Sequence, residues 1–200
     1  MAITEKGFVT VVSGLPRSGT SMMMGMLEAG GIPAMTDNLR VADDDNPLGY
    51  YEFELVKQLS RNALWLDNAC GKAVKVIYRL LYDLPRDRSY KVIFMRRKLE
   101  EIIASQKAML RRQNKEGGTL GDRQLADAFR SELQKLDVWM RGRDNFPLLH
   151  VNYDDVLYDS KHAVTGIEQF LGYKLDTLAM IRVINRSLHR QRVGDARITV

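Results

Sequence analysis

The architecture of this chain follows from residues 8–29, which run Phe8-Val-Thr-Val-Val-Ser13, then Gly14-Leu-Pro-Arg-Ser-Gly-Thr-Ser21, and then a helix-forming stretch to Ala29. Residues 8–13 are mostly β-branched or apolar, which is typical of a buried strand. Residues 18–29 are good helix formers, and the two glycines that follow them predict the end of a helix. A glycine-containing turn joins the two, so the segment predicts a loop whose backbone amides and helix N-terminus face an anion.

The alternation of strands and helices continues along the chain. Further strands are predicted at residues 73–77, 90–95 and 147–152, and helices at 54–66, 99–113, 122–140, 160–172 and from Asp176 to about Leu188, while residues 33–53 look irregular. Strands separated by helices imply crossover connections and a parallel sheet. We therefore expect one α/β domain over residues 1–200, with a P-loop nucleotide-binding fold, helices on both faces of a central parallel sheet, and ligands at the carboxyl ends of its strands.

The composition favours anionic partners. The 200 residues carry a formal net charge of +5, and 45% of them are hydrophobic, which excludes a disordered chain. Basic and acidic residues are interleaved and no aromatic-studded basic stripe appears, so we do not expect nucleic acid. The single cysteine, Cys70, and three widely separated histidines indicate a reducing compartment and no metal site. Without a signal peptide or a bilayer-length apolar run, we expect a cytoplasmic protein with no membrane contact.

The loop departs from that of the nucleotide triphosphatases at one position. Gly14 to Ser21 has the spacing of their phosphate-binding motif, but Thr20 stands where those enzymes have lysine. Arg17 must therefore supply the cation. A P-loop kinase would also need a strand-borne aspartate for magnesium, and none is evident. Such an ATP-binding kinase and a non-catalytic nucleotide-binding protein remain the alternative functions.

Two segments resemble those that bind the sulfate donor in the sulfotransferase family. Pro16-Arg17-Ser18-Gly19-Thr20-Ser21 is similar to the family's 5'-phosphosulfate loop. Residues 90–106 resemble its 3'-phosphate segment, in which a strand ends in arginine and the next helix carries serine eight residues later. Arg97 and Ser105 have this spacing, and Arg96 is the alternative arginine. The resemblance implies 3'-phosphoadenylyl sulfate (PAPS) as donor, 3',5'-adenosine bisphosphate (PAP) as product, and no metal.

Weaker matches extend the resemblance over residues 8–192. Val151-Asn-Tyr-Asp-Asp-Val156 is similar to a segment whose tyrosine meets the adenine, which implies this role for Tyr153, although a structural tyrosine is the alternative. Ser187-Leu-His-Arg-Gln-Arg192 resembles a basic terminus of bacterial members, so that Arg190 or Arg192 would cover the 3'-phosphate; a solvated tail is the alternative. Gly49-Tyr-Tyr-Glu52 also resembles a bacterial segment.

The resemblance implies catalytic roles for a lysine and a carboxylate. Lys75 stands where cytosolic members have a lysine, but Ile77 replaces their histidine base two residues later. Other branches use a carboxylate shortly after the loop helix, which makes Asp37 and Glu52 candidate bases. We favour Glu52, whose aromatic neighbours would bury it, although a purely structural role stays open for both.

The acceptor is not specified by the sequence. We expect a hydroxyl or amine on a small molecule or a carbohydrate. Three aromatic residues, Tyr50, Tyr51 and Trp65, are candidates to line its pocket, with core packing as the alternative. Short motifs specify neither the acceptor nor the oligomeric state.

Overall fold

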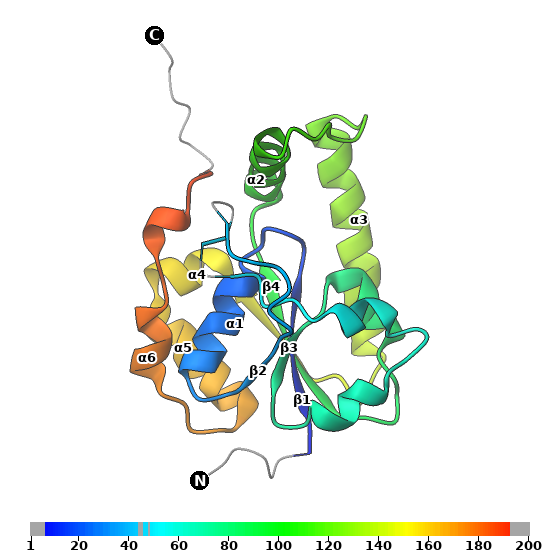
Figure 1. Ribbon diagram of the computed structural model, residues 1–200, viewed down its shortest axis with the longest axis vertical. Coiled ribbons are helices and arrows are strands. Elements are labelled where there is room, and N and C mark those ends of the chain that lie inside the picture. Colours follow the sequence, from blue (N-terminus) through cyan, green and yellow to red (C-terminus); the bar gives the residue numbers. More distant parts are fainter. Residues whose placement is uncertain (1–6, 44–45, 48, 193–200) are drawn as a thin grey trace.

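The computed structural model describes residues 7–43, 46–47 and 49–192. Its centre is a parallel sheet of five strands in the order β2-β3-β1-β4-β5 (Figure 1). The strands are β1 Val9–Gly14, β2 Ala34–Met35, β3 Ala73–Lys75, β4 Tyr90–Arg96 and β5 Leu148–Asn152. Because β1 lies between β3 and β4, the loop that follows it emerges at the middle of the carboxyl edge.

Helices cover both faces of this sheet. They are α1 Thr20–Ala29, α2 Leu99–Arg112, α3 Asp122–Arg141, α4 Tyr153–Tyr158, α5 Ser160–Leu171 and α6 Thr177–Arg182, with short 3₁₀ helices η2 Glu54–Gln58, η3 Leu64–Asn68, η4 Tyr78–Asp83 and η5 Arg186–Leu188. Figure 1 shows α2 and α3 apart from the group of α1, α5 and α6. The predicted α/β fold with a parallel sheet between helices is confirmed.

Side-chain alternation along the strands produces two separate cores. In β4, Val92 and Phe94 pack in the core that includes residues of α2 and α3, whereas Ile93 and Met95 pack with α1, α4, α5 and α6. Successive strand residues point to opposite faces, so a strand buried on both faces is apolar at nearly every position. This explains why the strands appear in the sequence as short continuous apolar runs.

Two predicted helices are interrupted, in each case beside an asparagine. The helix expected at 54–66 is replaced by η2 and η3, and the Asn62 side chain accepts a hydrogen bond from the Leu64 amide. The helix expected from Asp176 ends at Arg182, and the Asn185 side chain accepts from the Ser187 amide. Asparagine side chains compete in this way with the helical hydrogen bonds of the backbone.

The remaining differences are at short elements. The strand expected at 73–77 ends at Lys75, and β2 and α4 were not predicted. Within the described part of the chain, no helix combines the length and the apolar character required to cross a bilayer.

Candidate functional site

A cavity of about 840 Å³ opens at the carboxyl edge of the sheet. Residues that end or follow four strands line it: Gly14 at the end of β1, Lys75 at the end of β3, Arg97 after β4 and Tyr153 after β5. Among the described residues of its lining, two carry a carboxylate, Asp43 and Glu52, and eight are basic: Arg17, Arg40, Lys57, Lys75, Arg97, Arg112, Lys115 and Arg190. This excess of positive charge favours an anionic ligand.

The loop between β1 and α1 requires glycine at two positions. Gly14 and Gly19 have φ angles of +149° and +99°. A Cβ atom on Gly14 would lie 2.5 Å from the Ser18 hydroxyl, and one on Gly19 would lie 2.6 Å from the Tyr153 ring. Arg17 adopts a φ of +73°, which is uncommon for a residue other than glycine and often marks a functional segment. The chain is thereby bent tightly around the mouth of the cavity.

The N-terminus of α1 offers backbone amides to this cavity. Its N-cap is Gly19, which has no side chain to accept hydrogen bonds from the first turn. Thr20, Ser21 and Met22 of that turn line the cavity together with Pro16. A helix N-terminus with this exposure is a suitable site for an anion. Ser18, in contrast, is fully buried beneath the loop and outside the lining, so that its hydroxyl does not face the cavity.

The two segments that resemble donor-binding motifs meet at one junction. Arg17 Nε donates to Ser105 Oγ at 3.0 Å, and Arg97 Nη1 donates to the Arg17 carbonyl at 3.1 Å. All three residues line the cavity. Arg96, the alternative arginine, instead forms an ion pair with Asp137 at 2.5 Å and lies outside the lining.

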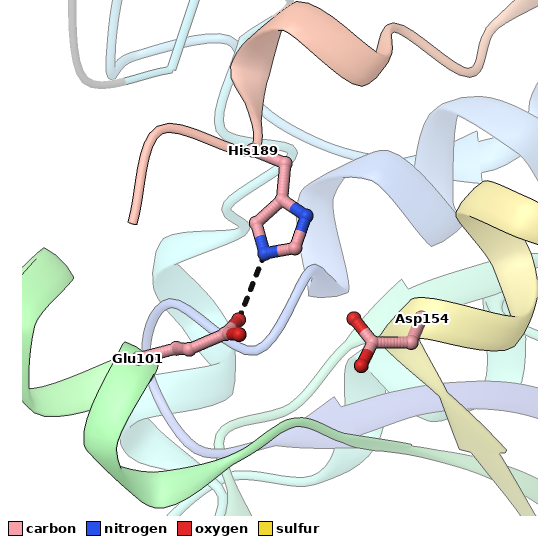
Figure 2. Close-up of side chains that lie close together, drawn as sticks. All are labelled: Glu101, Asp154 and His189. Atoms are coloured by element: carbon pink, nitrogen blue, oxygen red, sulfur yellow. Dashed lines mark hydrogen bonds and ion pairs between the residues drawn. The ribbon is translucent and has the colours of Figure 1, made fainter. Parts of the chain in front are cut away.

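Arg97 also connects the junction to the end of the described chain. Its Nη2 donates to the Gln191 carbonyl at 3.0 Å, and its Nε donates to Glu101 Oε2 at 2.9 Å. The same carboxylate oxygen lies 2.9 Å from His189 Nε2 (Figure 2). Glu101 and His189 are 2% and 5% exposed, so this is a buried charge network, in which each polar group needs its partner.

Asp154 lies beside this network, and with Glu101 and His189 it forms a group whose polar atoms could approach one ion (Figure 2). The two carboxylates of this group, Asp154 and Glu101, already form ion pairs with basic side chains of the same protein. Asp154 pairs with Lys98 at 3.0 Å, and Glu101 pairs with Arg97. A metal ion would have to displace these cations, so we interpret the group as a structural ion-pair network.

Of the other three residues expected at the nucleotide, Tyr153 and Arg190 line the cavity and Arg192 does not. Tyr153 begins α4, is buried, and lies with its ring 4.5 Å from the Arg97 guanidinium carbon. Burial raises the pKa of its phenol. Arg190 lines the cavity, whereas Arg192 donates to the His189 carbonyl at 3.2 Å and lies in a separate small groove beside Glu100.

Lys75 ends β3 and points into the cavity with its side chain 9% exposed. Its Nζ donates to the Tyr50 carbonyl and lies 3.3 Å from Ser21 Oγ and 4.0 Å from Glu52 Oε1. Burial is the main cause that lowers its pKa to about 8. The negative charge of Glu52 opposes this effect, and the positive charge of Arg40 adds to it. The lysine is thus a desolvated cation at the N-terminus of α1.

The two candidate bases have different surroundings. Glu52 lines the cavity, but its side chain is 25% exposed and forms an ion pair with Arg40 at 2.7 Å, so it is less buried than expected from the sequence. Asp37 lies outside the lining and accepts hydrogen bonds from the Glu54 and Leu39 amides. The bond from Glu54 is the main cause that lowers the Asp37 pKa. Asp37 therefore stabilises the start of η2.

The aromatic residues considered for the acceptor pocket also separate. Tyr50 lines the cavity, and its hydroxyl donates to Asp43 at 2.7 Å. Tyr51 and Trp65 lie outside the lining. The Tyr51 hydroxyl donates to Glu28 at 2.9 Å, and Trp65 packs edge-on against Phe53.

Sequence reasoning missed four basic residues of the cavity, Arg40, Lys57, Arg112 and Lys115. Arg40 lies in an irregular segment without periodicity and stacks 3.4 Å above the Tyr50 ring. A signal did exist for Arg112, because it is seven residues after Ser105 and therefore on the same face of a helix.

No model of a known protein family matches the sequence, and no curated protein matches it either. Three sulfotransferases are among the solved structures to which this structure is similar. The sulfotransferase domain of the Synechococcus PCC 7002 olefin synthase has 16% identity and a TM-score of 0.54, with 93% of this chain and 81% of that chain covered.

The other two structures give similar values. The sulfotransferase domain of the curacin biosynthetic pathway has 10% identity and a TM-score of 0.55, covering 90% and 78% of the two chains. A sulfotransferase of Mycobacterium tuberculosis H37Rv has 16% identity and a TM-score of 0.56, covering 88% and 71%. This chain therefore has the fold of sulfotransferase domains.

Proposed function

We propose that this protein is a cytoplasmic sulfotransferase that transfers a sulfuryl group from PAPS to a hydroxyl or amine of an acceptor. The observation that carries the proposal is the junction of Arg17, Ser105 and Arg97, since it unites on one cavity two segments that resemble the phosphate-binding segments of sulfotransferases. The fold shared with sulfotransferase domains supports it.

The cavity fits a donor that carries phosphate at both ends. Basic groups come from two sets of segments: Arg17 and Lys75 from the phosphate loop and β3, and Arg97 and Arg190 from the end of β4 and the last described segment. We assign the nucleotide to Pro16, Arg17, Ser18, Gly19, Thr20, Ser21, Arg97, Ser105, Tyr153 and Arg190. Ser18 would contribute its backbone alone, because its side chain is buried away from the cavity.

The chemistry needs stabilisation of the leaving group and a base. The donor, when bound, supplies a sulfuryl group whose bond to a phosphate oxygen breaks while the acceptor oxygen or nitrogen bonds to sulfur. Lys75, with a pKa of about 8, is mostly protonated at neutral pH and donates hydrogen bonds from a desolvated position, where they are strongest. Arg17 adds positive charge beside the α1 amides. No metal is needed for these roles.

Glu52 is the carboxylate best placed to take the acceptor's proton. Its Oε1 lies 4.0 Å from Lys75 Nζ, and the ion pair with Arg40 fixes its orientation. Asp37 is not proposed as a base, because both of its oxygens accept backbone hydrogen bonds outside the lining.

Selective binding of PAP tests this proposal. Thermal shifts would be measured with PAP, with magnesium-ATP and with magnesium-GTP, on the wild type and on Arg17→Ala, Arg97→Ala and Arg96→Ala. PAP at a hundred times its Kd should stabilise the native state by about 2.7 kcal/mol. Arg17→Ala and Arg97→Ala should abolish this shift, whereas Arg96→Ala should keep it, because Arg96 pairs with Asp137 outside the cavity.

The outcomes separate three functions. A shift with PAP that needs no magnesium, followed by sulfate transfer in an acceptor screen, supports a sulfotransferase. An equal response to all three nucleotides, or a response to magnesium-ATP alone, would contradict the proposal. Arg97→Ala also removes a partner of buried Glu101, so PAP affinity should be measured calorimetrically on variants that are verified to be folded.

A further inference from the structure

The last described stretch of the chain, residues 181–192, forms part of the cavity wall. Five of its residues line the cavity: Val183, Asn185, Leu188, Arg190 and Gln191. Within this stretch His189 is the one residue that is buried, while the others are half-buried or exposed. A segment that buries so little apolar surface is easily displaced. Its position beside the cavity therefore depends on the contacts of His189 and of a few other polar groups.

His189 connects this stretch to two helices through both nitrogens of its ring. Nε2 lies 2.9 Å from Glu101 Oε2 of α2, as Figure 2 shows, and Nδ1 lies 3.2 Å from the Tyr158 hydroxyl at the end of α4. Because an ionised carboxylate only accepts hydrogen bonds, we assign the ring proton to Nε2, so that Nδ1 accepts from the tyrosine. The imidazole also packs edge-on against the Tyr153 ring, with 5.3 Å between the ring centroids. His189 thus anchors the end of the described chain.

The same histidine supports the orientation of Arg97. Glu101 Oε2, which His189 contacts, also accepts the bond from Arg97 Nε at 2.9 Å. The Gln191 carbonyl, which accepts from Arg97 Nη2 at 3.0 Å, lies two residues after His189. Two of the three acceptors that fix the guanidinium are therefore held by His189, one through its side chain and one through the backbone that it anchors.

The guanidinium of Arg97 has further donors for a ligand. An arginine carries five N–H groups, and the bonds to Glu101, Arg17 and Gln191 use three of them. Each terminal nitrogen thus has one more N–H, and Arg97 lines the cavity. Two N–H groups in a fixed fork bind a phosphate in a defined direction. A rotation of the guanidinium would misdirect both of them.

We infer that His189 is a positioning residue that makes the nucleotide site selective for a 3'-phosphate. It lies outside the lining and acts through Arg97, and it keeps Arg190 and Gln191 at the cavity wall. This inference rests on the proposed function, because the resemblance to sulfotransferases assigns the 3'-phosphate to Arg97 and Arg190.

Two nucleotides that differ in the 3'-phosphate alone test the inference. Calorimetry would compare PAP with adenosine 5'-monophosphate (AMP), and the wild type should bind PAP about a hundredfold more tightly. His189→Phe keeps an aromatic ring for packing but has neither ring nitrogen. It should weaken PAP binding about tenfold and change AMP binding by at most about twofold.

The conservative variant separates positioning from a general structural role. His189→Gln has an amide that can donate to Glu101, so its preference for PAP over AMP should return to within about threefold of the wild type. A histidine that only stabilised the fold would, when replaced by phenylalanine, weaken the binding of both nucleotides alike. His162→Phe is the matched control, because His162 is an exposed residue of α5 outside the lining; both of its affinities should stay at wild-type values.

Tyr158→Phe tests the inference even if His189→Phe does not fold. It removes only the hydroxyl at His189 Nδ1, on a side chain that is largely exposed, and should reduce the preference for PAP about threefold. Equal weakening of PAP and AMP in His189→Phe overturns the inference, as does an unchanged preference in either His189→Phe or Tyr158→Phe. These results leave the donor site of the wild type intact. Failure of the wild type to bind PAP overturns both proposals.

Discussion

Lys75→Met should stabilise the protein at neutral pH while it removes activity. Burial lowers the pKa of Lys75 to about 8 from its ordinary value of 10.5. At about 1.4 kcal/mol for each tenfold change in proton affinity, keeping the ammonium charged in the cavity costs the native state roughly 3 kcal/mol. Methionine has a similar length without the charge. The hydrogen bond from Nζ to the Tyr50 carbonyl is lost in the variant and offsets part of the gain.

The pH dependence isolates the effect of the charge. Below pH 8 the lysine is protonated in both native and unfolded states, and the cost is complete. Between pH 8 and 10.5 the unfolded chain binds more protons than the native state, so the stability of the wild type rises with pH. Relative to Lys75→Met, the wild type should gain about 2 kcal/mol between pH 7 and pH 9.5.

Urea unfolding of both proteins across this range measures the difference, and groups that titrate in both cancel. Lys57→Met is the control, because the hydrogen bond with Glu54 raises the pKa of Lys57. A lysine whose native pKa is raised contributes the same stability at every pH below 10.5, so the difference between the wild type and Lys57→Met should not change across this range. A difference between the wild type and Lys75→Met that stays flat from pH 7 to 9.5 would refute the argument that Lys75 is a desolvated cation.

Two further substitutions test the geometry around the loop. Gly19→Ala should lower the free energy of unfolding by about 1–3 kcal/mol and weaken PAP binding. Residue 19 has a φ of +99°, and its Cβ would lie 2.6 Å from the Tyr153 ring. Thermal unfolding and calorimetry measure the two effects, and wild-type values in both would contradict the prediction. Glu101→Gln should cost about 3–5 kcal/mol, since the Arg97 side chain, which is 7% exposed, loses its carboxylate partner, whereas Glu54→Gln should cost at most about 1 kcal/mol. Equal losses in thermal unfolding would show that the Glu101 network is not a significant source of stability.

The elements that the sequence predicted well are those with local signals. β1, the loop and α1 follow one another within residues 9–29, where apolar runs and glycines mark each boundary. α2 and α3 are long enough for a helical period to be visible. β2, with two residues, and α4, with six, are too short to show a period. The strand order is set by pairing between distant segments, which local patterns do not report.

The candidate site, too, has features that local sequence patterns predicted and features that they did not. The spacing of Arg97 and Ser105 indicated that they act together, and both do lie beside Arg17. The surroundings of Glu52 were not predictable, because its partner Arg40 lies in a segment without periodicity. Nor was the bond between Arg97 and the Gln191 carbonyl, since it depends on a contact across 94 residues of sequence.

The bond between Arg97 and the Gln191 carbonyl has a consequence for biosynthesis. During translation the phosphate loop, β3 and β4 leave the ribosome long before residue 191. A nascent chain can thus assemble most of its sheet while one of the three partners of Arg97, the Gln191 carbonyl, is still to be made. Affinity for nucleotide should accordingly appear only after residue 191 has been made, and stalled chains that end before His189 should fold their sheet but hold PAP weakly.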